Sequence, residues 1–134
     1  MGGIARLKLL LDTHIWLWFR GDTTRLGRHA SAALKDAGNE LWLSPISTWE
    51  ALALHNKGRV QLHGNLIEWV ASATMGIKEA VLTHEIVAFS QELPLHKDPA
   101  DRLIAATAKV LDLTLVTADD RLLELAIIKT LANR

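Results

Sequence analysis

The stretch Lys8-Leu9-Leu10-Leu11-Asp12 decides the fold class of this chain. Three consecutive leucines without polar alternation are typical of a strand that is buried on both faces, as in a parallel sheet covered by helices. Asp is disfavoured within strands and common where strands end, so Asp12 marks the end of this one. Further short apolar runs, each followed by a longer helical pattern, predict an α/β architecture with a parallel sheet.

The same patterns predict where the other elements lie. We expect further strands at residues 41–43, 80–82 and 113–116, and an edge strand within 127–131. We expect helices at residues 13–20, 28–37, 47–57, 66–74, 84–93, 99–111 and 120–126. Thr13, Thr83 and Asp98 have the chemistry of N-caps, Ser47 and Glu50 have capping-box spacing, and Gly38 is suited to ending a helix.

The composition is that of a single domain spanning residues 1–134. The chain has 134 residues and a mass of 14.8 kDa, with 49% hydrophobic and 22% charged residues. It has no repeat, linker or low-complexity segment. No apolar run approaches the roughly 18 residues of a membrane span, and no secretory signal is apparent, so we expect no membrane association. The absence of cysteine excludes thiol nucleophiles and thiolate metal sites, and agrees with a cytoplasmic location.

The overall charge argues against a broadly cationic surface. Fifteen basic residues balance fifteen acidic ones, whereas a typical nucleic-acid-binding domain is basic. If five acids gather in one pocket, however, fifteen basic and ten acidic residues remain, and the rest of the surface carries a net charge of plus five. A charge-segregated protein is therefore compatible with these numbers.

Four acidic residues lie where a predicted strand gives way to a loop or where a helix begins: Asp12, Glu50, Asp101 and Asp119. In an open parallel sheet, ligands bind outside the carboxyl ends of the strands, so these side chains can converge there. Clustered carboxylates repel one another, and hard oxygen ligands favour Mg²⁺ or Mn²⁺. Each acid considered alone also fits a helix-capping role, so convergence is the argument for a site.

Four segments in this order resemble the motifs of PIN-domain proteins, and among these the VapC-type toxins of bacterial toxin–antitoxin pairs. The segments are Leu9-Leu10-Leu11-Asp12-Thr13-His14, Ser44-Pro45-Ile46-Ser47-Thr48-Trp49-Glu50, His96-Lys97-Asp98-Pro99-Ala100-Asp101-Arg102-Leu103-Ile104-Ala105 and Leu115-Val116-Thr117-Ala118-Asp119. Each motif alone is weak evidence. All four, at suitable separations over nearly the whole chain, are specific.

The resemblance implies a three-layer α/β/α PIN-like fold with a central parallel sheet of four to five strands, and a metal-dependent endoribonuclease activity. Asp12, Glu50, Asp101 and Asp119 match the acidic quartet that carries catalysis and holds Mg²⁺, or alternatively Mn²⁺. Thr117 matches a supporting hydroxyl residue, and Thr13 adjoins Asp12. Asp98 matches a frequent further acid, which holds an outer-shell water or caps the helix; we favour the cap. The resemblance also implies an RNA substrate, a cognate antitoxin whose C-terminal segment obstructs the acidic pocket, and a homodimer.

Substrate contacts are less well defined. Arg102 adjoins the acids and could contact a phosphate, or pair with Asp98 or another acid. A set of further cations could line an RNA path or simply be solvated: Arg20, Arg25, Arg28, Lys57, Arg59, Lys97 and Arg121.

The histidines and tryptophans do not define a further site. No histidine is assigned to a metal, because none shows tight ligand spacing, although His96 could touch substrate. Of the five tryptophans, we expect Trp42, Trp49 and Trp69 in the core. Trp16 or Trp18 could line an interaction groove or stack on bases.

Three other readings of the sequence compete with a nuclease. A phosphatase with Asp12 as nucleophile typically has an Asp two residues later, where this chain has His14. A receiver-like module needs an acidic pair at the first strand and a Lys after the last core strand, and both are missing. A degenerate PIN domain that binds RNA or a partner without cleaving is disfavoured by the complete acidic quartet. The chain has no GxxxxGK[ST], GxGxxG or GxSxG motif.

Overall fold

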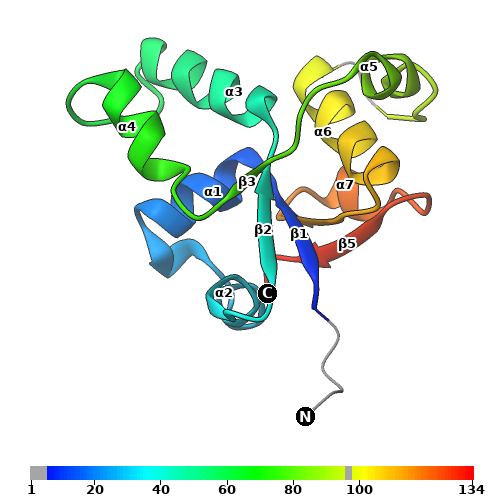
Figure 1. The fold of residues 1–134 in the computed structure, drawn as a ribbon, viewed down its shortest axis with the longest axis horizontal. Helices are drawn as coiled ribbons and strands as arrows, with labels where there is room; N and C mark the ends of the chain where they lie inside the picture. Colours follow the sequence, from blue (N-terminus) through cyan, green and yellow to red (C-terminus); the bar gives the residue numbers. More distant parts are fainter. Residues whose placement is uncertain (1–5, 96–97) are drawn as a thin grey trace.

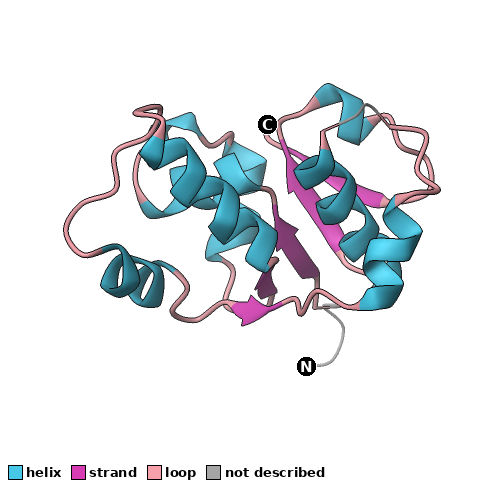
Figure 2. Ribbon diagram, turned by 90° about the horizontal axis from the view of Figure 1, so that it is seen from above, coloured by secondary structure: helices cyan, strands magenta, loops and turns pink. Residues whose placement is uncertain are grey.

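A computed structural model describes residues 6–95 and 98–134 of the chain. Parallel strands form a central sheet with helices on both faces (Figures 1 and 2). In chain order the elements are β1 (Lys8–Leu11), α1 (Thr13–Arg20), the short 3₁₀ helix η1 (Thr23–Arg25), α2 (Arg28–Lys35), β2 (Glu40–Leu43), α3 (Pro45–Asn56), α4 (Leu66–Ala73), β3 (Lys78–Glu79), α5 (His84–Ser90), α6 (Pro99–Val110), β4 (Thr114–Thr117), α7 (Asp120–Leu123) and β5 (Lys129–Ala132).

The sheet within the described residues has five strands in the order β3-β2-β1-β4-β5, and every neighbouring pair is parallel. The first strand, β1, therefore lies at the centre, with Leu9 opposite Leu41 of β2 and Leu10 opposite Leu115 of β4. This arrangement confirms the expected three-layer fold with a central parallel sheet. Because all strands run the same way, their carboxyl ends meet at one edge, where Asp12 and Asp119 follow β1 and β4.

Side chains of the central strands alternate between two hydrophobic cores. Leu9 and Leu11 pack with Trp16 in the core under α1 to α4, whereas Leu10 packs with Ile104 in the core under α5 to α7. The two helical layers lie on opposite sides of the sheet in Figure 1. Successive residues of a strand point to opposite faces, so three leucines in a row are what a strand between two apolar layers requires. Among the described residues, no helix combines the length and apolar character needed to cross a membrane.

The residues that cap three helices can be compared with the expectation. The caps of α1 and α3 differ from it, and the cap of α6 agrees with it. Asp12, not Thr13, is the N-cap of α1, because its carboxylate accepts the Thr13 amide. Helix α3 begins at Pro45 rather than Ser47, and Ser44 caps it; proline suits the first helical position because its missing N–H would have no partner there. The prediction for Asp98 is confirmed, since it caps α6 through the amides of Ala100 and Asp101.

Several expected ends were wrong by a few residues. The third strand is Lys78–Glu79 rather than 80–82, and only the Ala80 amide continues the pairing, to the Leu43 carbonyl at 2.9 Å. Beyond Ala80 the chain leaves the sheet to begin α5. Helices α2, α5 and α7 end two or three residues earlier than expected, at Lys35, Ser90 and Leu123.

The burial of the tryptophans differs in part from the expectation. Trp16 is fully buried and its indole N–H donates to the Ala73 carbonyl at 2.9 Å. Trp42 and Trp69 pack against the cores, as expected. Trp49 is 64% exposed, so its assignment to the core was wrong. It lies on α3, whose apolar residues are spread around the helix, so the pattern did not identify the buried face.

Candidate metal-binding active site

One cavity of about 550 Å³ lies at the carboxyl end of the sheet and contains the acidic residues singled out from the sequence. Asp12, Glu50, Asp98, Asp101 and Asp119 all contribute to its wall, and the other lining residues are His14, Ile15, Trp18, Arg25 and Ala118. The acids come from segments of the chain that are up to 107 positions apart. The parallel topology brings them together at one edge of the sheet: Asp12 and Asp119 follow strands, Asp98 and Asp101 lie at the start of α6, and Glu50 lies in the second turn of α3.

Three of these acids are also helix N-caps. Asp12 caps α1, Asp98 caps α6 and Asp119 caps α7, each by accepting hydrogen bonds from backbone amides of the first turn. The amides carry partial positive charge and therefore reduce the repulsion among the neighbouring carboxylates. Capping and participation in the cavity are thus two roles of the same side chains rather than alternatives.

A buried hydroxyl connects Asp12 and Asp119. Thr117, fully buried at the end of β4, donates through Oγ1 to Oδ2 of Asp12 at 2.6 Å and accepts from the Asp119 amide at 3.0 Å. The second Asp12 oxygen accepts from the Thr13 amide at 2.9 Å. These contacts fix the orientation of the Asp12 carboxylate between the two central strands.

A second buried hydroxyl connects α1 to α3. Thr13 is 1% exposed, and its Oγ1 donates to Oε1 of Glu50 at 2.5 Å. Thr13 therefore contacts both Asp12, through its amide, and Glu50, through its hydroxyl. The structure thus places the two threonines named from the sequence between the acids that they were expected to support.

Burial raises the pKa of the Asp12 carboxyl above its ordinary value of 3.8, and the hydrogen bond from Thr117 is the largest effect that opposes the rise. The Asp119 carboxylate raises this pKa further, and His14 lowers it. An anion at Asp12 is therefore held at an energetic disadvantage in the isolated protein. A nearby cation would remove that disadvantage, because opposite charge favours the ionised form.

Arg121 supplies a positive charge to Asp119. Its Nε lies 3.4 Å from Oδ1 and a terminal guanidinium nitrogen 3.3 Å from Oδ2 of Asp119. The Asp119 side chain is 23% exposed and the Arg121 side chain 61% exposed, so solvent screens the pair. The hydrogen bonds to Asp119 raise the pKa of Arg121, as do the charges of Asp119, Asp101 and Asp98. Arg121, one of the cations that could line an RNA path or simply be solvated, thus pairs with an acid of the cavity wall.

The donor chemistry of the cavity suits a hard divalent cation, since its acidic lining offers only carboxylate oxygens. Within residues 6–95 and 98–134, however, no three Asp, Glu or His side chains lie close enough together to ligate one ion. The carboxylates already accept hydrogen bonds from other groups. Glu50 accepts one from Thr13, Asp98 accepts one from the Ala100 amide, and Asp119 accepts one from Arg121. A metal ion would have to exchange these partners for itself.

Arg102, named from the sequence as a possible phosphate contact, lies outside the wall of the acidic cavity. Arg102 donates to the Leu95 carbonyl at 2.7 Å and lines a separate hollow between α5 and α6, not the acidic cavity. His96 and Lys97 lie outside the described residues. Arg25, in contrast, was one of seven cations without a defined place, and the structure puts it in the cavity wall. Only the fold shows this, because Arg25 is far in sequence from all five acids that line the cavity.

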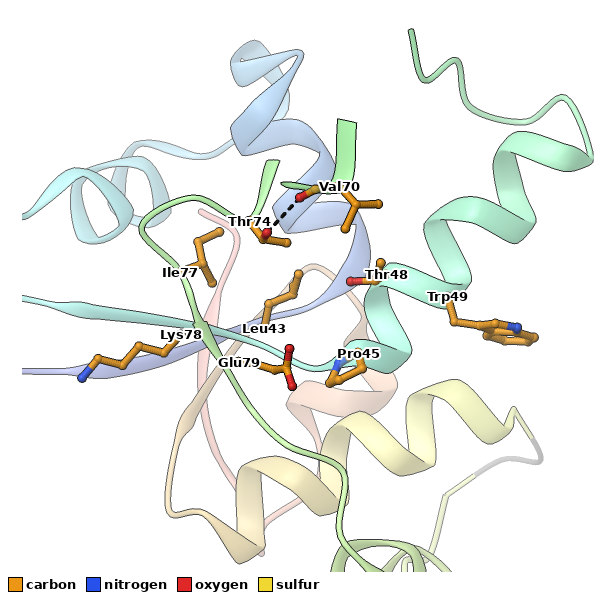
Figure 3. A pocket seen from close by; sticks show the side chains of 9 residues that line it. All are labelled: Leu43, Pro45, Thr48, Trp49, Val70, Thr74, Ile77, Lys78 and Glu79. Atoms are coloured by element: carbon orange, nitrogen blue, oxygen red, sulfur yellow. Dashed lines mark hydrogen bonds between the residues drawn. The ribbon is translucent and has the colours of Figure 1, made fainter. Parts of the chain in front are cut away.

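A second hollow, of about 410 Å³, lies beside the edge strand β3 and is mostly apolar (Figure 3). Leu43, Val70 and Ile77 contribute to it, and Trp49 stands at its rim on α3. The hydroxyl of Thr74, also in its wall, donates a hydrogen bond to the Val70 carbonyl at 2.8 Å. Its lining contains one carboxylate, Glu79, so it lacks the donor set of the acidic cavity.

The fold and the site together define a class: a parallel α/β protein with a multi-carboxylate pocket at the carboxyl ends of its central strands. The PIN domain family model matches residues 9–128. The chain therefore belongs to the PIN domain family. It is 35% identical over 116 residues to Ribonuclease VapC22 of Mycobacterium tuberculosis, a match that covers 85% of this chain and 88% of that protein.

Solved structures share the fold at lower identity. VapBC2 from Rickettsia felis, bound to a promoter DNA fragment, matches with a TM-score of 0.70 and 15% identity over 94% of this chain and 98% of the other. DNA-bound VapBC from Salmonella typhimurium matches with a TM-score of 0.68 and 16% identity, covering 96% and 99%. A toxin–antitoxin complex from Klebsiella pneumoniae matches with a TM-score of 0.60 and 20% identity, covering 94% and 98%.

Proposed function

We propose that this protein is a divalent-metal-dependent endoribonuclease and the toxin of a toxin–antitoxin pair. The observation that carries the proposal is the gathering of five carboxylates around one cavity in a PIN-domain chain. The related protein named a ribonuclease, and the toxin–antitoxin complexes with the same fold, support it.

In this proposal Asp12, Glu50, Asp101 and Asp119 hold Mg²⁺, with Mn²⁺ as an alternative. A bound cation polarises the scissile phosphate and makes a bound water more acidic. The chain's own residues prepare the site. Thr117 and Thr13 orient the carboxylates of Asp12 and Glu50. Asp98 positions Asp101 by accepting its backbone amide at 3.3 Å.

Water, rather than a side chain, is the nucleophile in this proposal. Both oxygens of Asp12 already accept hydrogen bonds, and the residue two positions later is His14 rather than a second carboxylate. These features disfavour the alternative of a phosphatase with Asp12 as nucleophile. Turnover of p-nitrophenyl phosphate, with a phosphorylated Asp12 detected by mass spectrometry, would support that alternative instead.

The proposed partners are RNA as substrate and a cognate antitoxin, in the cytoplasm. The antitoxin would act by covering the acidic cavity. The protein itself would form a homodimer, which light scattering after gel filtration tests directly. We also retain the proposal that Arg102, which follows Asp101 on α6 but lines a separate hollow, contacts the RNA backbone.

The test is RNA cleavage by the purified protein across a cellular RNA pool, with cut sites mapped by sequencing. Cleavage should require Mg²⁺ or Mn²⁺ and stop in EDTA. Asp101→Asn should abolish it without unfolding the protein, because the side-chain shape is kept and one negative charge is lost. Asp120→Asn is the matched control, since Asp120 is exposed and outside the cavity wall. Cleavage that persists in EDTA, or an active Asp101→Asn protein, would refute the proposal.

A further inference from the structure

The wall of the acidic cavity includes a group of residues with the opposite chemical character. His14, Trp18 and Arg25 line the same cavity as the five carboxylates. His14 and Trp18 are four residues apart on α1 and therefore share one face of that helix. Arg25 ends η1, the next element along the chain. These three side chains take no part in the proposed metal site.

Trp18 contacts both of the other side chains of this cluster. The Arg25 guanidinium carbon lies 5.9 Å from the centroid of the Trp18 ring, within the range of a cation–π contact. The ring centroids of His14 and Trp18 are also 5.9 Å apart, at an interplanar angle of 50°. Trp18 is partly buried against the core under α1 to α4, which anchors the ring beside the cavity. The cluster thus combines an anchored aromatic ring with a planar cation.

The backbone that carries Arg25 is held in place from the far end of the chain. The Asn133 side chain donates to the Arg25 carbonyl at 3.0 Å and accepts from the Gly27 amide at 2.7 Å. The Asn133 amide donates to the Thr117 carbonyl at 3.0 Å. Through Asn133, the loop that carries Arg25 is therefore hydrogen-bonded to the end of β4, beside the carboxylates. The Arg25 side chain also makes an exposed ion pair with Asp22, 3.5 Å away, which another anion can replace.

The charge of the cavity gives Arg25 a further role. A single strand of RNA carries a negative charge on each phosphate, and the carboxylates repel it. Among the described residues that line the cavity, Arg25 is the one lysine or arginine. It is thus placed to attract a backbone phosphate next to the acidic wall, while Trp18 offers a ring on which a base can stack.

We propose that Trp18 and Arg25, flanked by His14, form a nucleotide subsite that binds the RNA residue next to the scissile bond. Arg25 contacts a backbone phosphate and Trp18 stacks with a base. This inference rests on the proposed ribonuclease function and extends it to substrate binding. Because every base has an aromatic face, the subsite positions the strand and does not by itself select a sequence.

The test measures binding of a short, fluorescein-labelled, single-stranded RNA by anisotropy in EDTA, and KM and kcat for the same RNA in Mg²⁺. Trp18→Leu should weaken binding by about five- to one-hundredfold, the effect of losing one stacked base, and raise KM more than it lowers kcat. Arg25→Gln should lower the slope of log affinity against log salt by about 0.7, the value for one phosphate contact on a single strand. Arg25→Lys should restore that slope.

The matched controls are Trp49→Leu and Arg6→Gln, which change an exposed tryptophan and an exposed arginine outside the acidic cavity. Both should bind and cleave RNA like the wild type. Circular dichroism verifies that each variant is folded.

Three results distinguish a wrong subsite from a wrong ribonuclease function. If Trp18→Leu and Arg25→Gln keep wild-type affinity and KM while the protein cleaves RNA, the subsite is wrong and the ribonuclease function stands. The subsite is equally wrong if these variants lose only binding to a purified antitoxin, because the cluster then belongs to a protein interface. If the wild type neither binds nor cleaves RNA, the proposed function itself fails.

Discussion

Replacing Thr117 with valine removes a hydroxyl that joins two of the acidic residues and leaves the side-chain shape nearly unchanged. The substitution deletes the hydrogen bond to Oδ2 of Asp12 at 2.6 Å and the one accepted from the Asp119 amide at 3.0 Å. A hydrogen bond to a charged group contributes about 1.5–3 kcal/mol, and a buried donor left without a partner costs about 1–3 kcal/mol. Because the Asp119 amide is only partly buried, we expect a total loss of about 3 kcal/mol in the free energy of unfolding.

That loss should depend on pH. Burial raises the pKa of Asp12 in the folded protein, and Thr117 opposes the rise. A carboxyl whose pKa is raised on folding favours the fold at acidic pH, and that stability is lost as the pH rises through the folded-state pKa. Thr117→Val raises this pKa further. The difference in stability between wild type and variant should therefore be largest near pH 7 and smaller near pH 4, because Asp12 takes up a proton as the pH falls.

Thermal unfolding in EDTA, followed by circular dichroism at both pH values, measures the effect. A loss of about 3 kcal/mol corresponds to a decrease in Tm of about 10 °C for a chain of this length. Thr117→Ser is the control, because it keeps the hydroxyl and loses one methyl group, for about 1 kcal/mol at either pH. An equal decrease in Tm at pH 7 and at acidic pH would show that the hydroxyl does not act through the charge on Asp12, and would refute this reasoning.

Three further predictions concern the acidic wall. Asp119→Asn should abolish RNA cleavage while Asp120→Asn leaves it near the wild-type rate, because only Asp119 lines the cavity; equal losses in a cleavage assay would mean that the fourth acid is misassigned. Arg121→Ala should tighten Mn²⁺ binding about two- to fivefold in isothermal titration calorimetry, because the screened pair with Asp119 no longer competes with the metal. Unchanged affinity would contradict that competition. Asp98→Ala should lower the free energy of unfolding by about 1 kcal/mol through loss of the α6 cap, whereas Asp98→Ser, which can still cap, should not; denaturant titration of both variants decides.

The hydroxyl contacts also reduce the cost of gathering several carboxylates around one cavity. Thr13 and Thr117 are both buried and each donates to a different acid. The amides at the helix starts and the guanidinium of Arg121 contribute further positive character. The acids are thus held near one another by neutral donors and one exposed cation, and a divalent ion would compete with these weaker partners.

Local signals in the sequence were sufficient for much of the fold. The continuous Leu9-Leu10-Leu11 run predicted a central strand buried on both faces, and the structure places β1 there. Asp98 followed by Pro99 predicted the start of α6 correctly. Signals of this kind depend on a residue's own backbone preferences and on nearest neighbours, which are present in the sequence itself. The start of α3 was misplaced because Ser44 and Ser47 have the same capping chemistry, although Pro45 suits the first position of a helix capped by Ser44.

The sequence by itself also singled out the acids that line the cavity, because their places near predicted strand ends and helix starts are readable from the pattern. Only the tertiary structure decided which side chains meet: Thr117 with Asp12, which are 105 residues apart, and Arg25 in the cavity wall. The same holds for the exposure of Trp49. These features depend on strand order and on how loops close over the sheet, and such long-range contacts leave no periodicity in the chain.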